Sequence, residues 1–295
     1  KILKDEKTIH EKDSKVLAAE SDYLKKYENK SYVLLNMIKE IQQSRSDENV
    51  GRIIRILNMT NNLPPRTDLS NLNMSDSVLE GTNFTSMKLT NSNFTKCNLR
   101  GANFFNSDLK NVDFTDSNLS GSNFTKCILY KTKFNFADVN NTNFGDMDLD
   151  FTDFTMANLT KSNLVNVKLN HTQFRGSTFI GAKLGSINFR EMNLQDAVFV
   201  GAELSDVNFA YADLSNSDFT GCDLKSQNFT GSILNKAKLY GTDLTNAVFN
   251  KAKLHRAKFA GAIMEGTDLS NAELHHVNDL PISSDDALER GTRIM

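Results

Sequence analysis

The chain has 295 residues, a formal net charge of −2 at pH 7 and a hydrophobic content of 39%. A charge this close to balance excludes a general electrostatic attraction to nucleic acid or to an anionic membrane surface. No apolar run reaches the length of a transmembrane helix, and the start of the sequence does not resemble a signal peptide. Because the chain begins with Lys1 and not with Met, we expect it to be a fragment of a larger protein.

Residues 1–66 are predicted to be α-helical. Apolar side chains recur there at helical spacing, and Ser46 is placed to cap the last of three helical segments. Pro64 and Pro65 end that segment. We expect this region to form a bundle that caps the structure that follows, because an open sheet edge is prone to unwanted pairing. The alternative is a separate helical domain that binds a partner.

From residue 67 to residue 277 the sequence is built from units of five. Starting at Leu69, every fifth residue up to Leu274 is Leu, Phe, Met or Val, and we call these residues the centres. A mostly small residue stands two positions before each centre, and polar residues or Gly fill most of the other positions. Self-similarity at a short fixed period is typical of a solenoid, in which each unit stacks on its neighbours.

A period of 20 is superimposed on the period of five. Gly stands two residues after a centre at positions separated by multiples of 20, which are Gly81, Gly101, Gly121, Gly181, Gly201, Gly221, Gly241 and Gly261. We therefore expect four pentapeptides to close one coil, with one corner that needs special backbone geometry. With strands stacked about 4.8 Å apart, roughly ten coils would form a rod on the order of 50 Å long.

These repeats resemble the pentapeptide repeat family, whose pattern is A(D/N)LXX. Close matches are AELSD at residues 202–206 and ADLSN at residues 212–216. The resemblance implies a right-handed, four-sided parallel β-helix, in which the centre and the residue two before it point inward. It implies no single activity. Some members of the family bind type II topoisomerases by imitating the shape and charge of DNA.

The predicted fold class is therefore mainly β, with a helical region before the β-helix and a short helix after it. We divide the chain into three parts, which are the α-helical region 1–66, the β-helix 67–277 and the C-terminal cap or tail 278–295. The repeat ends because Asp279 stands where a centre is due and Pro281 prevents further ladder pairing. Ser283 or Ser284 can cap a short helix at residues 285–290, which we expect to cover the last coil.

Phe and Leu alternate along the centres, and at one point in the chain the Phe residues move to the sides that held Leu. From Phe84 to Phe154, Phe takes every second centre, so it is expected to stack on two opposite sides of the rod. Beyond this span, Phe appears on the sides that held Leu. We predict that the core repacks between residues 164 and 189, where the larger inward residues Ile187 and Met192 fill the join.

Four of the small inward positions hold a thiol or an amide. Cys97, Cys127 and Cys222 are interpreted as buried structural thiols, and the absence of a disulfide framework favours a reducing, cytoplasmic compartment. Gln227 needs internal hydrogen-bond partners or a local opening of the coil. We expect backbone groups, and not a ligand, to satisfy it.

No motif of an enzyme or of a cofactor site is present in the sequence. There is no phosphate loop, nucleophile elbow, paired-cysteine motif or metal-binding helix. The adjacent His275 and His276 are interpreted as an exposed pair and not as a metal site. We therefore predict no catalytic residue, no cofactor and no metal.

A row of outward apolar residues on one side of the rod is the candidate binding surface. Ile180, Val200 and Tyr240 each follow a centre at multiples of 20, and Val198 precedes one. Such a stripe is typical of contact with a partner protein or a second copy of the chain. The alternatives are cover by a terminal segment of the same chain and chance.

Charged residues flank this stripe. An acidic column on the next side is expected to repel itself unless a basic group binds, and basic residues gather between residues 236 and 258. The complete set of candidate partner-binding residues is Ile180, Val198, Val200, Glu203, Asp223, Lys238, Tyr240, Asp243 and Lys258.

The function predicted from these patterns is that of a non-enzymatic scaffold for protein–protein interaction. We expect it to be the recognition portion of a bacterial, effector-like protein that acts in the cytoplasm or in the cytosol of a host cell. The alternative is a DNA-mimicking protein that binds a topoisomerase such as gyrase. Mixed surface charge disfavours this alternative, because imitation of DNA requires a strongly acidic surface.

Overall fold

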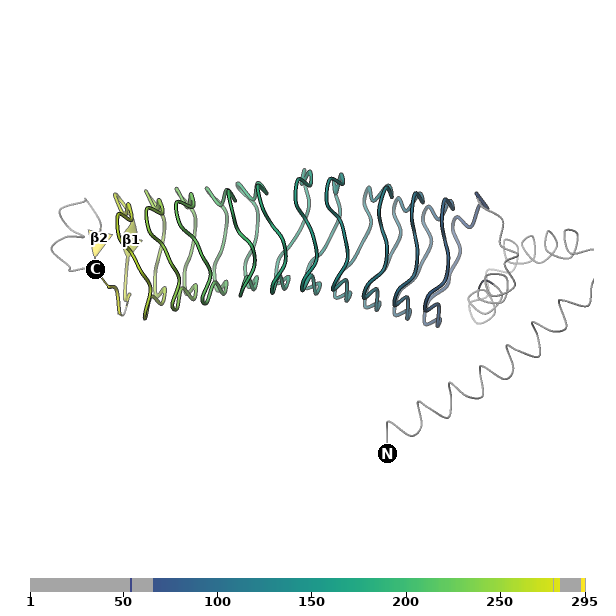
Figure 1. Cartoon of the computed structure of the whole chain (residues 1–295), viewed down its shortest axis with the longest axis horizontal. Helices are drawn as coiled ribbons and strands as arrows, with labels where there is room; N and C mark the ends of the chain where they lie inside the picture. The colour runs from purple at the N-terminus through teal and green to yellow at the C-terminus, as the bar shows by residue number, and fades with distance from the viewer. Residues whose placement is uncertain (1–53, 55–65, 278, 282–292, 295) are drawn as a thin grey trace, which may run out of the picture.

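The computed structural model describes residues 54, 66–277, 279–281 and 293–294, and residues 66–277 form one gently arched rod (Figure 1). The predicted helical region 1–66 lies outside the described residues, apart from Ile54 and Arg66. The predicted helix at 285–290 lies outside them as well. No helix within the described residues is long and apolar enough to cross a membrane.

Each coil of the rod contains 20 residues and four sides, which confirms the predicted β-helix. The residue before each centre pairs in parallel with the residue 20 positions later, as in Asp68↔Lys88 and Val78↔Asn98. A right-handed sense is the one that crossover connections between parallel strands adopt. We number the sides in chain order, so that sides one to four have their first centres at Leu69, Met74, Leu79 and Phe84.

Most sides contribute a single paired residue between two corners, and regular strands form only at the C-terminal end of the described rod. The two strands are β1, Glu273–Leu274, and β2, Arg293–Ile294. They pair in parallel, with Glu273 opposite Arg293. Strand β2 therefore adds a further rung to side two at the same spacing of 20 residues.

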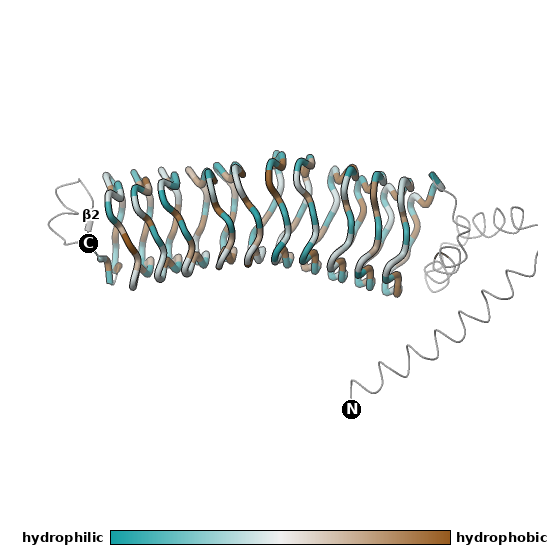
Figure 2. Tube along the Cα trace, viewed as in Figure 1, coloured by the Kyte–Doolittle hydropathy of each residue, from teal (hydrophilic) through white to brown (hydrophobic). Residues whose placement is uncertain are grey.

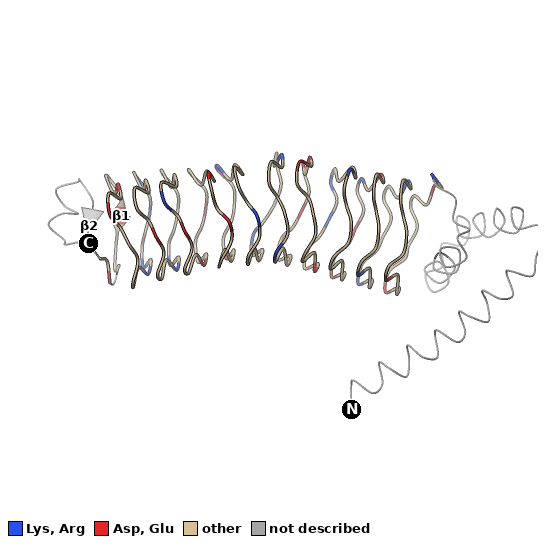
Figure 3. Cartoon of the chain, viewed as in Figure 1, with Lys and Arg blue, Asp and Glu red and all other residues tan. Residues whose placement is uncertain are grey.

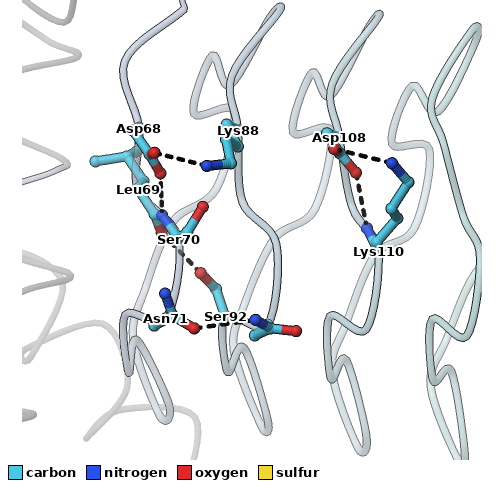
Figure 4. A network of polar contacts seen from close by, with 9 residues as sticks. Asp68, Leu69, Ser70, Asn71, Lys88, Ser92, Asp108 and Lys110 are labelled. Atoms are coloured by element: carbon cyan, nitrogen blue, oxygen red, sulfur yellow. Dashed lines mark hydrogen bonds and ion pairs between the residues drawn. The ribbon is translucent and has the colours of Figure 1, made fainter.

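Nearly all centres are completely buried, and the small inward residues close the space beside them. Many of these small residues are Ser or Thr, whose hydroxyl donates to a carbonyl of the preceding coil. The Ser92 hydroxyl, for example, donates to the Leu69 carbonyl at 2.7 Å (Figure 4). This bond satisfies a polar group that would otherwise be buried without a partner.

All four corners of every coil adopt the left-handed conformation, so the prediction of one special corner is wrong. Every fifth residue from Arg66 to His276 has a positive φ, and most of these residues are not Gly. Asn and Asp tolerate this region better than most residues. The residue before the centre helps to fix the turn, since the Asp68 carboxylate accepts from the Ser70 amide at 3.0 Å (Figure 4).

The predicted stacking of Phe is confirmed. Phe84 and Phe104 stack with ring centroids 5.0 Å apart, and Phe94 crosses the rod to meet Phe84 edge to face at 5.6 Å. The change of phase occurs at Phe174, which stacks on Phe154 and meets Phe179 edge to face. Hydrophobic residues recur along every coil while polar ones alternate with them (Figure 2).

The parallel ladder is interrupted at three places, although no loop interrupts the repeats. Among the described residues, the pairings that are missing from the expected series are 123/143, 128/148, 168/188, 173/193 and 203/223. Side three alone has a continuous series, from Val78 to Lys258. The second interruption coincides with the predicted repacking of the core, where Ile187 and Met192 accompany a separation of the coils.

Side-chain size at one inward column explains these openings. On side one, the position two before the centre holds five consecutive residues larger than Thr, which are Met147, Val167, Ile187, Val207 and Gln227. Stacked large side chains push neighbouring coils apart, since interiors tolerate little excess volume. Along this column, every second pair of adjacent coils is separated. Each separation gives room to the large side chains on both sides of it, so the next pair of coils can stay in contact.

Candidate functional site

Side three places the predicted apolar stripe on the most regular surface of the rod. Ile180 is 41% exposed, whereas Val198, Val200 and Tyr240 are half-buried. The uninterrupted ladder beneath them fixes their spacing along the rod. They are aligned along side three, where Thr220 takes the position between Val200 and Tyr240.

Two exposed apolar residues that the sequence interpretation missed lie at the other edge of side three. Phe136 and Met156 occupy the corner between sides two and three and are 57% and 50% exposed. Met156 lies over Gly176, in space that a side chain at that position would fill. Exposed apolar side chains therefore also lie at this edge, in the coils before the predicted stripe.

The predicted basic residues of side three are engaged with neighbouring side chains. The Lys238 ammonium contacts the Asp218 carboxylate at 2.9 Å, and Lys258 lies 6.0 Å from the centroid of the Tyr240 ring. Burial alone would raise the pKa of Asp218, but hydrogen bonds from Thr220 and Lys238 outweigh it and lower that pKa. The apolar row is thus accompanied by paired charges.

The acidic column on side four is partly neutralised within the chain, which corrects the prediction that it needs an external basic group. Lys225 contacts the carboxylate of Asp243 at 3.2 Å and that of Asp223 at 3.7 Å. A hydrogen bond from Thr245 is the main cause that lowers the pKa of Asp243, and Lys225 contributes further. Glu203 stands apart, on the other side of the third interruption.

That interruption opens a cavity of about 720 Å³, which is lined by Glu203, Asp223, Lys225 and Gln227, among others. The Gln227 amide nitrogen donates to the Lys225 carbonyl at 3.4 Å, whereas its amide oxygen is buried without a partner. Gln227 therefore accompanies an opening of the coil, and the backbone satisfies only half of its amide. The third interruption therefore leaves a hollow in the surface of the rod.

The three cysteines are inert in this environment. Desolvation raises the pKa of Cys97 and of Cys127 to about 12 and that of Cys222 to about 11. Each Sγ donates to a carbonyl of the preceding coil, at 2.8 to 3.1 Å. These contacts agree with the predicted structural role, although Cys127 is only half-buried.

A separate aromatic cluster lies near the corner between sides one and two. The Phe151 ring stacks on His171 at 4.3 Å and meets Tyr130 edge to face at 5.4 Å. Lys131 lies within 6 Å of both the Tyr130 and the Phe151 rings. Tyr130 and Phe151 stay 40% and 39% exposed, so this cluster is a second exposed aromatic surface of the rod.

One group of described side chains could hold a metal ion. His255, Glu273 and His275 bring their ligand atoms within 4.8 Å of one another on side two. His275 stacks on His255 across the coils, so the sequence interpretation of His275 and His276 as a simple exposed pair missed this contact. The signal that could have found it is the spacing of 20 residues between His255 and His275.

Comparison with known families identifies the repeats. The family described as "Pentapeptide repeat region" matches residues 58–124 and 174–248. The family described as "Pentapeptide repeats (8 copies)" matches residues 107–146, 146–179 and 247–278. Together the matched ranges cover the whole β-helix. No curated protein is a significant match to the sequence.

Several solved structures are similar to the chain. HetL, a pentapeptide repeat protein involved in heterocyst differentiation regulation from the cyanobacterium Nostoc sp. strain PCC 7120, is 21% identical; the match covers 70% of this chain and 89% of HetL with a TM-score of 0.45. A trypsin-treated variant of QnrB1, a plasmid-mediated fluoroquinolone resistance protein, is 19% identical over 68% of this chain and 91% of that one, with a TM-score of 0.41. The protein alr5209 from Nostoc PCC 7120 is 25% identical over 40% of this chain and 84% of its own, with a TM-score of 0.22.

Proposed function

The chain belongs to the pentapeptide repeat family, and on this premise we propose that it is a non-enzymatic scaffold that binds another protein through side three. The observation that supports the proposal most is the number of apolar side chains along side three and its edge, which are Phe136, Met156, Ile180, Val198, Val200 and Tyr240. Large contiguous apolar surfaces on soluble proteins are typical of protein contacts. The row lies on the side whose ladder is continuous.

A rigid backbone favours binding because little conformational freedom is lost when a partner docks. The side-three residues are held by ladder hydrogen bonds such as Gly181 N to Val200 O at 3.1 Å and Gly221 N to Tyr240 O at 2.8 Å. Val198 and Val200 then supply branched side chains with few rotamers. The partner would be a protein, or a second copy of this chain, with a complementary apolar strip.

The proposal is tested with two matched variants. Met156→Lys/Ile180→Lys places two charges on the side-three surface, and Ile128→Lys/Ile263→Lys places them on equally exposed apolar positions of other sides. Proteins captured from a lysate by the wild-type chain are identified by cross-linking and mass spectrometry. A partner that is retained by the control variant and lost by the side-three variant supports the proposal. Equal recovery with both variants contradicts it.

The alternative of a DNA-mimicking, topoisomerase-binding protein receives less support. Acidic side chains in the described rod often pair with lysines of the next coil, as Asp68 does with Lys88 at 2.9 Å and Asp113 with Lys133 at 3.5 Å. Both signs of charge are scattered along the rod (Figure 3). Such pairs cancel the field that imitation of DNA requires. We expect no inhibition of gyrase in a supercoiling assay.

The bacterial, effector-like origin and the site of action in a host cytosol stay predictions from composition. The same holds for a capping role of residues 1–66. Deletion of that region would test it: a cap should keep the rod monomeric, and its loss should lead to end-to-end association of the open coil.

A further inference from the structure

We infer that His255, Glu273 and His275 form a binding site for a divalent transition metal, with Zn²⁺ as the ion that fits best. The inference does not depend on the proposed function of side three, because the three residues lie on side two. It starts from the way in which the repeat places these side chains.

The period of 20 brings the two imidazoles together. His255 and His275 each follow a centre of side two, in consecutive coils, and their rings stack with centroids 4.3 Å apart and planes 8° from parallel. Glu273 and His275 stand on either side of the same centre, Leu274. The Oε2 of Glu273 lies 3.2 Å from the Nε2 of His255. The three ligand atoms all lie within 4.8 Å of one another.

The backbone holds these residues in place before any ion binds. The Leu254 amide donates to the Glu273 carbonyl at 2.8 Å, and the Arg256 amide donates to the His275 carbonyl at 2.8 Å. The His255 amide donates to the Asn235 side chain at 3.2 Å. A ligand set fixed on a ladder loses little freedom on binding an ion.

The chemistry of the donors favours zinc over calcium or magnesium. Two imidazole nitrogens and one carboxylate oxygen are typical zinc ligands, whereas Ca²⁺ and Mg²⁺ prefer oxygen alone. Glu273 supplies the only carboxylate among the three ligands, and a set with one carboxylate oxygen offers too few oxygen ligands for Ca²⁺ or Mg²⁺.

The side chains must rearrange to bind the ion. A metal ion lies in the plane of each imidazole that holds it, so the stacked and nearly parallel rings of His255 and His275 have to turn. Two ligands at about 2.0–2.1 Å from a tetrahedral zinc lie about 3.3 Å from each other, so the ligand atoms must approach by on the order of 1 Å. The side chains of His255 and Glu273 are 33% and 32% exposed, which leaves room for that movement and a path for the ion. Water would complete the fourth position.

Bound there, the ion would join two coils near the C-terminal end of the described rod. It would tie the coil of His255 to that of His275 and hold Glu273, which belongs to β1. Since β1 is the strand on which β2 pairs, the ion would also stabilise the last rung. This role predicts that the ion protects the C-terminal coils against unfolding.

The experiment uses the full chain without a histidine tag, stripped of metal by a chelator. Isothermal titration with Zn²⁺ should give one site per chain, and Co²⁺ should give the visible absorption of a tetrahedral complex. We expect His255→Ala and His275→Ala to bind zinc at least about tenfold more weakly, because the loss of a group that only supports a ligand already lowers metal affinity by about 10–100-fold. Glu273→Gln should also bind zinc more weakly. His276→Ala and His171→Ala are the matched controls and should bind as the wild type does.

Circular dichroism checks that each variant is folded, and His275→Gln, which keeps the volume of the side chain, replaces His275→Ala if that variant is not. Zinc should raise the melting temperature of the wild type and of His276→Ala but not of His275→Gln. The inference is overturned if the wild type shows no stoichiometric zinc binding, or if His276→Ala loses as much affinity as the His275 variants.

Discussion

Replacing Gln227 by Ala should stabilise the rod, although it removes a buried side chain. The Gln227 amide oxygen is buried without a partner, and an unsatisfied buried group costs about 1–3 kcal/mol. The substitution also removes a buried methylene, worth about 0.8 kcal/mol, and the hydrogen bond from the Gln227 amide nitrogen to the Lys225 carbonyl, worth about 1 kcal/mol. These contributions nearly cancel, so the stabilisation is expected to come from closure of the coil.

Closure should follow, because Ala is the residue at the next position of the same column, Ala247, where the ladder is intact. In the structure, the ladder hydrogen bonds from the amides of Leu204, Asp223 and Asn228 are missing at the third interruption. We expect these three amides to become protected in Gln227→Ala.

Amide hydrogen exchange reports on this closure, and it suits a repeat protein whose unfolding need not be two-state. Gln173→Ala, on an exposed position, is the control and should change stability by less than about 0.5 kcal/mol. If the three amides exchange as fast in Gln227→Ala as in the wild type, the attribution of the opening to Gln227 is wrong. A lower urea midpoint for the variant would refute the energetic argument as well.

Three further predictions concern the core and the surface. Iodoacetamide should label Cys97 only after unfolding, because burial raises its pKa to about 12 and leaves almost no thiolate near neutral pH; labelling of Cys97 in the native protein, located by mass spectrometry, would contradict this. Phe209→Ala should lower stability by about 3–5 kcal/mol, since Phe209 stacks between Phe189 and Phe229, whereas the exposed Phe136→Ala should have a small effect on the urea midpoint. The lowered pKa of Asp218 means that its stabilisation is complete above the ordinary value of 3.8 and is lost as the pH falls through the lower, folded value. Asp218→Asn should therefore flatten the acid limb of a stability–pH curve, and an unchanged limb would count against the stabilising bonds from Thr220 and Lys238.

The repeat predicts the architecture well because one physical rule acts in every pentapeptide. A buried centre every five residues and a small residue two before it leave few alternatives to a four-sided coil. The stacking of Phe follows from the same rule, since residues 20 apart must lie above one another. For this reason the positions of Phe84 and Phe104 could be inferred without coordinates.

The openings and the corners could not be inferred in this way. Whether two coils separate depends on the combined size of stacked side chains such as Val207 and Gln227, and no single pentapeptide contains that information. The corners were misjudged because Gly is only one of several residues that adopt positive φ there. Phe136 and Met156 could have been found by a scan of the corner position, where large apolar residues are uncommon.

The candidate metal site was missed for a related reason. Adjacent residues such as His275 and His276 attract attention in a sequence, but residues that stack on each other in this β-helix are 20 positions apart in the sequence. His255 and His275 meet because each follows a centre of the same side. In a repeat protein, a search for ligand clusters should therefore use the coil period as its unit of distance.

The continuous ladder on side three and the openings on the other sides give the rod unequal stiffness in different directions. Bending that lengthens side three would stretch a series of backbone hydrogen bonds from Val78 to Lys258. Bending that widens the other sides would act on contacts that are already open at three interfaces. Thermal motion should therefore curve the rod around side three while the distances between residues on that side stay nearly constant. A protein bound along side three would meet the same spacing of side chains whatever the curvature of the rest.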